Sequence, residues 1–360
     1  MCTRDKKNLG TVLRAGRVGV LVLAVVGLVG LPRTLWGQGK ETAIEGLRVG
    51  MIGLDTSHAP AFTKLINADD AQGTLAKIRV VAAFPGGSRD LPSSRDRVEG
   101  YTQQMQAMGV EIVDSIPDLL QRVDAVLLES VDGRVHLEQV LPVFRSGKPV
   151  FIDKPLAADL VDALAIEMAA EKYHARWFSS SSLRFSPSIE RFRSDAALAS
   201  SVRGAISWSP CSLDPTHTDL TWYGIHGMET LYTAMGPGCT HVSRVHTEGA
   251  DVVTGIWKDG RVGTYRGIRD GKTGYGLIVF TEKQIFTDSR YEGYGPLVVK
   301  IADFFWGEEP PVSPQETIEM FAVMQAAEES KERHGALIAV DDVLQRARDA
   351  ARKRLAQLDP

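Results

Sequence analysis

The sequence has few cysteines, little excess of charge of either sign and, beyond residue 31, no long apolar run. The formal net charge is −4 and basic residues do not cluster after the first twenty positions, which argues against a nucleic-acid partner. Of the three cysteines, Cys2 lies near the start, so Cys211 and Cys239 are left for one disulfide or for two buried free thiols. Segments of disordered composition and convincing internal repeats are also absent.

The first 37 residues have the layout of a secretory signal or an N-terminal anchor. Five basic residues precede an uncharged apolar run from Val18 to Leu31. The run is shorter than the roughly 20 residues of a spanning helix, which favours a cleaved signal, although no clean small-x-small cleavage site follows it. We therefore expect an exported protein, periplasmic or extracellular, whose only contact with a membrane is an uncleaved form of this segment.

Apolar strands alternate with helical patterns from residue 46 to residue 182. With 360 residues and 44% hydrophobic content, the chain has enough material for two domains with full cores. The alternation predicts an α/β fold with a Rossmann-type doubly wound parallel sheet, covered on both faces. The expected strands are Leu47–Ile52, Arg79–Phe84, Glu111–Val113, Asp124–Glu129, Pro149–Ile152 and Arg176–Ser179.

Residues 183–342 have longer strand candidates joined by turn signals. This pattern predicts an α+β domain with a more antiparallel open sheet. The expected strands are Gly204–Pro210, Val252–Lys258, Arg261–Gly267 and Gly276–Phe286, and the expected helices are Thr221–Met235 and Pro314–Arg333. A C-terminal helix within residues 343–360 closes the chain.

The stretch Gly53–Ala59 (GLDTSHA) lies between the first strand and a helical pattern, where a dinucleotide-binding unit carries G-x-G-x-x-G. Only the first glycine, Gly53, is present, and Asp55 and His58 stand at the positions of the other two. Glycine lets a pyrophosphate approach backbone N–H groups, whereas Asp55 adds bulk and a like charge. Asp55 or one of the two residues after it can also cap the helix. We therefore expect a side chain of the protein to occupy some of the N–H donors that a phosphate would use.

The end of the second strand lacks an acidic residue. In an NAD enzyme such a residue, about 20 or more positions past the glycines, holds the ribose. Here Phe84 is followed by Pro85-Gly86-Gly87-Ser88-Arg89. Arg89 is a candidate for the 2′-phosphate of NADP or for a substrate anion, so NADP is less excluded than NAD, and an ordinary turn with a solvated arginine is the equal alternative.

Four stretches resemble, in order, motifs of the glucose–fructose oxidoreductase / inositol dehydrogenase (Gfo/Idh/MocA) family. They are Gly147–Ala157 (GKPVFIDKPLA), Leu183–Pro187 (LRFSP), Tyr223–His226 (YGIH) and Pro311–Thr317 (PVSPQET), within a match that spans residues 47–342. The resemblance implies a Rossmann domain followed by an open-sheet domain, with a sugar or polyol bound between them beside the nicotinamide of NAD or NADP. It also implies a homo-oligomer formed through the exposed sheet face.

By the same resemblance, Lys154 and His226 are the catalytic residues. Lys154 would bind and polarise the reacting hydroxyl, and His226 would exchange its proton. The family's Glu before the lysine is Asp153 here, and the Asp of its second motif falls on Trp222, which cannot act as a base or a ligand. Glu229 lies three residues after His226 and shares its face on a helix, so it is the fourth catalytic candidate.

Carboxylates and an imidazole are expected together at the carboxyl edge of the first sheet, where ligands bind in such folds. The residues expected to contact a cofactor are Gly53, Asp55, Thr56, Ser57, His58, Arg89, Glu129 and Asp132. The alternative is a divalent metal or an acid/base cluster, with Asp55, His58, Glu129 and His226 as candidate metal ligands. Each of these residues can instead serve only as a helix cap or in a salt bridge. This simpler role is favoured more for Asp132 and Asp153 than for Asp55 and His58.

Substrate contacts are expected from the second domain. The candidates are Arg184, His217, Asp219, Trp222 and Tyr223. The two aromatic rings suit stacking on a sugar, although core packing explains them equally well.

Three functions stay open from these patterns. The first, which we predict, is an exported oxidoreductase that acts on a sugar or polyol hydroxyl and holds its NAD(P) tightly, because free nicotinamide is scarce outside the cytoplasm. The second is an enzyme that has lost the nicotinamide and uses carboxylates, histidines or a metal for hydrolysis, elimination or epimerisation. The third, a non-catalytic sugar-binding protein, is disfavoured because Lys154 and His226 are both present.

Overall fold

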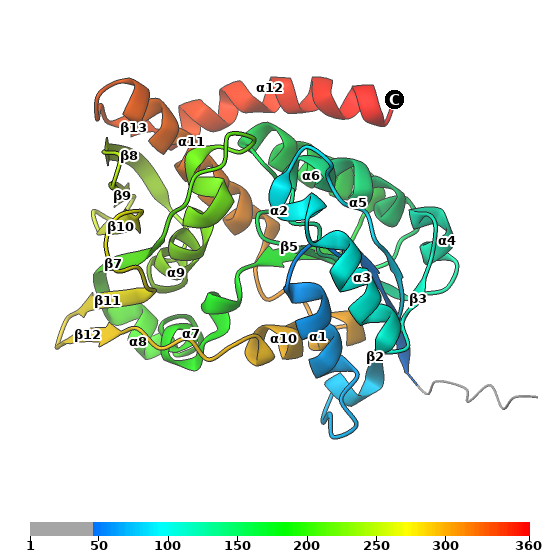
Figure 1. The fold of residues 1–360 in the computed structure, drawn as a ribbon. Helices are drawn as coiled ribbons and strands as arrows, with labels where there is room; N and C mark the ends of the chain where they lie inside the picture. Colours follow the sequence, from blue (N-terminus) through cyan, green and yellow to red (C-terminus); the bar gives the residue numbers. More distant parts are fainter. Residues whose placement is uncertain (1–45) are drawn as a thin grey trace, which may run out of the picture. The chain divides into compact units, whose positions relative to one another are not determined.

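The computed structural model describes residues 46–360, which contain two β-sheets with helices packed against them (Figure 1). The expected signal or anchor, residues 1–37, lies outside the described residues. Within residues 46–360, no helix is both long enough and apolar enough to cross a membrane.

The first sheet is parallel and confirms the predicted doubly wound Rossmann-type architecture. Its strand order is β3-β2-β1-β4-β5-β6, the order of a dinucleotide-binding fold. The strands are β1 Leu47–Ile52, β2 Ile78–Phe84, β3 Glu111–Ile112, β4 Ala125–Leu128, β5 Val150–Asp153 and β6 Trp177–Ser180. The expected boundaries differ from these by no more than one residue, because these strands are short, apolar and bounded by turns.

Helices cover both faces of this sheet because its strands are apolar on both. On one face, Met51 of β1 packs in one cluster with Phe62 of α1, Met105 of α3 and Leu297 of α10. On the other face the core includes residues of α5 and α6. The helices are α1 His58–Ile66, α2 Pro92–Arg95, α3 Val98–Ala107, α4 Ile116–Leu120, α5 His136–Arg145, α6 Leu160–Tyr173 and α10 Gly295–Trp306. Thus α10, from within residues 183–342, is part of the core of the first sheet.

The second sheet has the order β12-β11-β7-β10-β9-β8-β13, in which β7 and β10 pair in parallel and the other pairs are antiparallel. Its strands are β7 Val202–Pro210, β8 Cys239–His246, β9 Ala250–Trp257, β10 Val262–Ile268, β11 Gly276–Thr281, β12 Ile285–Asp288 and β13 Ile338–Ala339. The single strand expected over 276–286 is wrong, because the N–H of Thr281 donates to the carbonyl of Gln284 and turns the chain into a β11–β12 hairpin. Strand β8 was not expected.

Helix α9 (Ile225–Met235) packs against β7 and β10 of this sheet, and its eleven residues are all buried. The short elements η3 (Ser182–Phe185), α7 (Pro187–Ser194) and α8 (Ala196–Ser201) lead into β7. Burial alternates along β9 and β10, so that Ile256 of β9 and Val262 of β10 are exposed. The homo-oligomer expected through the exposed sheet face stays a prediction.

The C-terminal elements connect the two sheets. Helix α11 (Pro314–Glu332) packs against β8, and α12 (Val340–Leu358) lies along α6 of the first domain (Figure 1). Arg354 of α12 donates from Nε to Asp162 Oδ1 of α6 at 3.0 Å, and Lys172 holds Asp359 at 3.0 Å. The helix expected within 343–360 is α12, which begins three residues earlier, at Val340. Cys211 and Cys239 are both buried free thiols, which is the second of the two expected states.

Candidate active site

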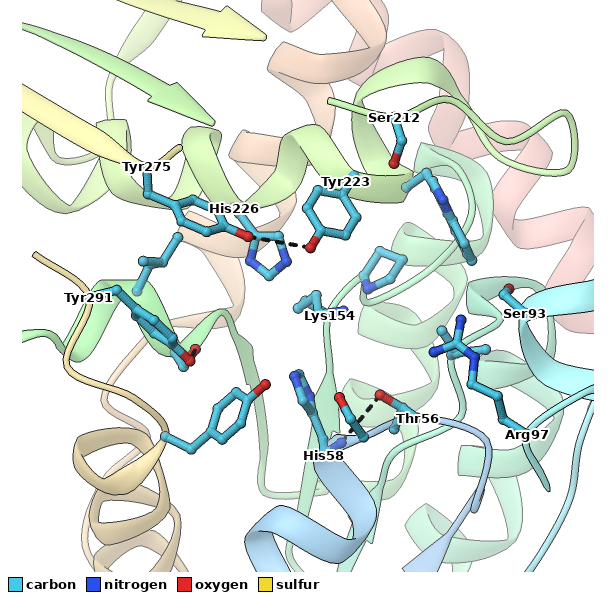
Figure 2. Close-up of a pocket in the computed structure, with 17 residues that line it drawn as sticks. Thr56, His58, Ser93, Arg97, Lys154, Ser212, Tyr223, His226, Tyr275 and Tyr291 are labelled. Atoms are coloured by element: carbon cyan, nitrogen blue, oxygen red, sulfur yellow. Dashed lines mark hydrogen bonds between the residues drawn. The ribbon is translucent and has the colours of Figure 1, made fainter. Parts of the chain in front are cut away.

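A pocket of about 420 Å³ opens where the carboxyl edge of the first sheet meets the second domain (Figure 2). This volume is in the range of sites for small molecules. Seven of the site residues predicted from the sequence line it: Thr56, Ser57, His58, Lys154, Trp222, Tyr223 and His226. The lining residues that sequence reasoning missed are Ser93, Arg97, Val131, Pro155, Ser182, Leu183, Ser212, Tyr275, Tyr291 and Tyr294.

Lys154 and His226 come from different domains and both reach this pocket (Figure 2). Lys154 directly follows β5, and His226 lies in the first turn of α9. The Nδ1 atom of His226 lies 2.7 Å from Ser181 Oγ, which leaves Nε2 for a ligand. Burial, helped by the charges of Lys154 and His58, lowers the pKa of His226 well below its usual value. A neutral imidazole at neutral pH can therefore accept a proton from a bound hydroxyl.

His58, Asp153 and Glu129 form a buried group beside Lys154. His58 begins α1, Asp153 ends β5 and Glu129 follows β4. Nδ1 of His58 lies 2.7 Å from Asp153 Oδ2 and 3.9 Å from Glu129 Oε2. The His58 ring also stacks on Phe62, with 5.1 Å between ring centroids. The third-glycine position of the loop therefore carries a side chain that reaches across to the ends of two other strands.

The two carboxyls of this group differ in pKa. Burial first, and then repulsion by Asp153, raise the pKa of Glu129 well above its usual value. Burial also acts to raise the pKa of Asp153, but the charges of His58 and Lys154 outweigh it and lower that pKa. Carboxyl groups whose pKa values are pushed apart in this way are typical of functional sites.

Four tyrosines form one side of the pocket: Tyr223, Tyr275, Tyr291 and Tyr294. The hydroxyl of Tyr275 donates to that of Tyr223 at 3.3 Å (Figure 2). Burial raises the pKa of Tyr291 to about 12 and also raises that of Tyr294, so these phenols stay protonated. Rings with a hydroxyl at one end suit a ligand that carries both C–H and O–H groups. Tyr275 and Tyr294 each stand between two glycines in the sequence, and this repeated pattern was the signal that could have found them.

Trp222 and Tyr223 lie in a local widening of the helix. Residues Leu220–Gly224 form a π-helical turn, η4, which continues directly as α9. Such turns are rare and occur often at functional sites. Both aromatic side chains line the pocket, as expected for substrate contacts.

In the loop after β1, the first glycine, Gly53, packs closely against the backbone of the loop after β4. Gly53 has φ +89°, and a Cβ there would lie 2.4 Å from the backbone nitrogen of Ser130. Asp55 is fully buried and turned away from the pocket, where it accepts from the N–H of Val131 at 2.9 Å and from Ser94 Oγ at 2.5 Å. The expectation that Asp55 places bulk and charge against a phosphate is therefore corrected.

The residues around this loop that do line the pocket fit a phosphate group. Within residues 46–360 the N–H groups of Thr56 and Ser57, at the positive end of α1, donate to no acceptor, and Ser57 makes no capping bond. Arg97 lines the same side of the pocket and forms no ion pair in the described part of the chain (Figure 2). No acidic residue for a ribose follows β2, and Arg89 is exposed and outside the pocket lining. The phosphate end of a dinucleotide fits better than its adenosine end.

Several expected site residues do not line the pocket because they pair with one another. Arg184 Nε donates to Glu229 Oε2 at 2.6 Å, and Arg184 Nη1 donates to Glu316 Oε1 at 2.6 Å. Glu229 also accepts from the N–H of Ser181 at 3.1 Å, so it supports the residue that holds His226. Arg184 and Glu229 thus position the site, which corrects the expectations that Arg184 touches substrate and that Glu229 is catalytic.

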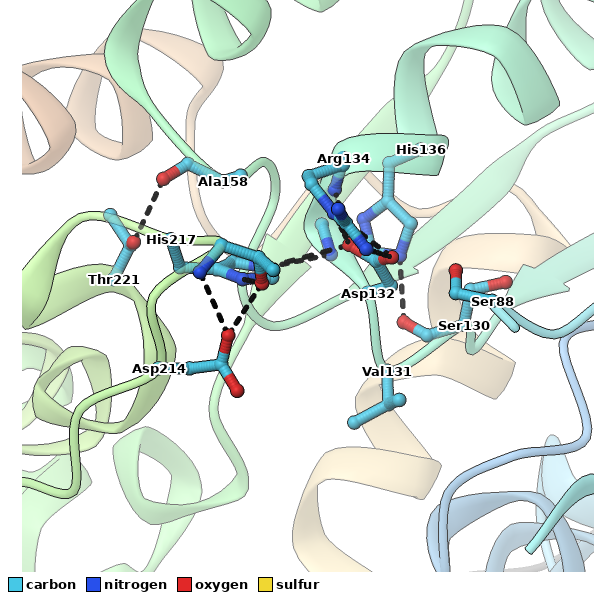
Figure 3. A network of polar contacts seen from close by, with 12 residues as sticks. Ser88, Ser130, Val131, Asp132, Arg134, His136, Ala158, Asp214, His217 and Thr221 are labelled. Carbon is cyan, nitrogen blue, oxygen red and sulfur yellow. Dashed lines mark hydrogen bonds and ion pairs between the residues drawn. The ribbon is translucent and has the colours of Figure 1, made fainter. Parts of the chain in front are cut away.

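A second polar network holds Asp132 and His217 away from the pocket (Figure 3). Asp132 is paired with Arg134, with 2.7 Å between Oδ2 and Nη2. His217 accepts at Nε2 from the N–H of Gly133 at 3.0 Å and so ties the second domain to the loop after β4. Asp219 is paired with Arg244 at 2.7 Å. Glu129 is buried beneath the lining, so of the expected acidic cofactor contacts none is on the pocket surface.

Comparison with known proteins identifies the same fold. Residues 47–181 match the model of the Gfo/Idh/MocA family, an oxidoreductase family with an NAD-binding Rossmann fold. The chain is 32% identical over 128 residues to the inositol 2-dehydrogenase of Cereibacter sphaeroides, which covers 35% of this chain and only 33% of that relative.

Solved structures extend the likeness to both domains. The scyllo-inositol dehydrogenase of Lactobacillus casei, with bound NAD(H) and scyllo-inositol, has a TM-score of 0.65 at 14% identity and covers 82% of this chain and 99% of its own. The myo-inositol 2-dehydrogenase of Lactobacillus plantarum has a TM-score of 0.65 at 15% identity, with coverage of 82% and 99%. At these identities the likeness is one of fold.

Proposed function

We propose that this chain, whose residues 47–181 belong to the Gfo/Idh/MocA oxidoreductase family, oxidises or reduces a hydroxyl of a sugar or cyclitol with NAD or NADP. One observation carries the proposal: Lys154 and a neutral His226 converge on one pocket at the carboxyl edge of a dinucleotide-binding sheet. The relatives named for inositols make cyclitols the first substrates to test.

The residues of the pocket divide the work in this proposal. The nicotinamide, when bound, accepts or donates the hydride. The N–H groups of Thr56 and Ser57, with the Arg97 guanidinium, hold the phosphates. The Lys154 ammonium binds and polarises the reacting hydroxyl, and Nε2 of His226 takes or returns its proton. The protonated tyrosines orient the remaining hydroxyls of the ring.

The experiment begins with cofactor content. The purified chain is denatured and the supernatant is assayed for nicotinamide, and the native chain is then assayed with NAD⁺ and NADP⁺ against a panel of cyclitols and sugars. Lys154→Met and His226→Gln are expected to lower kcat/KM by about 10²-fold or more while the fold is kept. Lys283→Met and His241→Gln, which change exposed residues of the second sheet, are matched controls and should leave the rate unchanged. A chain that neither contains nor binds a nicotinamide contradicts the proposal.

A second function is favoured by one specific observation, the His58–Asp153 pair at 2.7 Å. An imidazole at the pocket surface, oriented by a carboxylate, is the arrangement of a general base. We propose it as the basis of hydrolysis, elimination or epimerisation in the same pocket, to be assayed if no nicotinamide binds. Export to the periplasm or the extracellular space, which either function tolerates, stays a proposal from the N-terminal sequence.

A further inference from the structure

We propose that His58, Glu129 and Asp153 form a binding site for one divalent transition-metal cation. One ligand atom from each of the three residues lies within 4.8 Å of the other two. The first residue of α1, the residue after β4 and the last residue of β5 supply them. All three are buried, and Glu129 and Asp153 are 0% and 1% exposed. This proposal does not depend on whether the chain uses a nicotinamide.

The strongest support is a deficit of hydrogen bonds in the described structure. Both carboxyl oxygens of Glu129 and Oδ1 of Asp153 are buried without any hydrogen-bond partner among residues 46–360. Buried polar atoms are almost always satisfied, and leaving them bare is costly. A proton on Glu129 does not remove the whole deficit, because one O–H group can serve at most two of these three oxygens. A cation bound by one oxygen of each carboxyl and by the imidazole would satisfy part of this deficit.

The charges around the group also favour a cation. Lys154 acts electrostatically on both carboxyls, yet among residues 46–360 the only basic group within 4.0 Å of either carboxyl is the imidazole of His58. With a cation bound, both carboxyls would be ionised, and their two negative charges would exceed the one positive charge of Lys154. The distances from His58 Nδ1 to Asp153 Oδ2, 2.7 Å, and to Glu129 Oε2, 3.9 Å, lie on either side of the separation of about 3.4 Å between ligands of a tetrahedral ion with bonds of about 2.1 Å.

The ligand set indicates the class of ion. One imidazole nitrogen with carboxylate oxygens suits Zn²⁺, Mn²⁺, Fe²⁺ or Co²⁺, whereas Ca²⁺ and Mg²⁺ prefer oxygen alone. Three protein ligands leave a coordination position for water or a substrate oxygen. Of the three residues only His58 lines the pocket, which Lys154 also lines, so the cation would face the pocket on its His58 side. Asp55 and His226, two metal ligands expected from the sequence, are not part of this group, since Asp55 is held by Ser94 and His226 by Ser181.

The test is a direct measurement of metal binding. The full chain is treated with a chelator, dialysed and titrated with Co²⁺, whose visible absorption reports protein ligands, and Zn²⁺ and Mn²⁺ content is measured after dialysis. We expect one equivalent of metal, and we expect Glu129→Gln to weaken binding by at least tenfold. Asp132→Asn changes another fully buried carboxylate, the one paired with Arg134, and should bind as the unaltered chain does.

Each outcome decides the proposal. Failure of the folded, unaltered chain to bind one equivalent of any of the three ions overturns it, as does equal binding by Glu129→Gln, His58→Ala and the control. Far-UV circular dichroism shows whether each variant is folded, and Asp153→Asn replaces any variant that is not. Nicotinamide content is measured on the same samples, so loss of the proposed redox function and loss of the metal site give separate signals.

Discussion

At the scale of single residues, His217 makes the stability of the chain depend on pH. Burial lowers the pKa of His217 to about 4, although Asp132 and Asp214 oppose this shift. The unfolded chain takes up a proton near the usual pKa of about 6.5, and the folded chain takes it up only near pH 4. Stability from this residue is therefore complete above about pH 6.5 and falls as the pH drops toward 4. The loss reaches about 3 kcal/mol.

Urea unfolding at pH 7.5 and pH 4.5 measures this effect. We expect His217→Gln to lose less stability between the two pH values than the unaltered chain, because it has no proton to gain. His241→Gln, an exposed histidine of β8, serves as the control and should keep the full pH dependence. An identical loss in the His217 variant would mean that another group sets the dependence.

The sequence predicts some residues of the site better than others, for reasons that differ in kind. Lys154 and His226 were found because motifs mark them, and His58 because it replaces a glycine whose position is fixed by a strand and a helix. Arg184 and Glu229 were misjudged because a sequence shows charges without showing which of them neutralise each other across 45 residues. Tyr291 comes from a turn-rich segment, where neither periodicity nor spacing predicts which side chains reach a pocket.

At the scale of elements, one substitution is expected to have opposite effects in two helices. In α9, a Cβ on Gly227 would lie 2.2 Å from Cε2 of Tyr265 in β10, so Gly227→Ala must push the helix from the sheet. Overpacking of this kind costs about 1–3 kcal/mol. In α3, a Cβ on Gly100 meets nothing within 4 Å, and Gly100→Ala should stabilise by about 0.5–1 kcal/mol. Thermal and urea unfolding of both variants measure whether the free energy of unfolding falls in the first and rises in the second. A stabilised Gly227 variant would contradict the packing.

The elements also show where prediction from sequence ends. The buried parallel strands were located to within one residue because both their faces are apolar, which leaves a continuous signal. Strand β8 was missed because its apolar residues, Cys239, Val242 and Val245, fall three apart rather than two apart. Its Arg244 is fully buried and is neutralised there by Asp219, Asp251 and Glu328, and such pairing is a tertiary effect. Helix α10 was not predicted, because nothing in its own sequence shows that it packs on the first sheet.

At the scale of the whole molecule, α12 is expected to make the two sheets unfold together. It follows directly on β13 of the second sheet and packs along α6 of the first domain, where Leu355 is 9% exposed. Removing most of such a side chain costs about 2 kcal/mol or more. We expect Leu355→Ala to lower the stability of both sheets by that amount, measured as faster hydrogen exchange in β5 and in β9. Leu337→Ala, 54% exposed just before β13, should change neither. If exchange rose in β5 alone, the site between the domains would rest on two units that unfold separately, and its geometry would depend on their docking rather than on one cooperative fold.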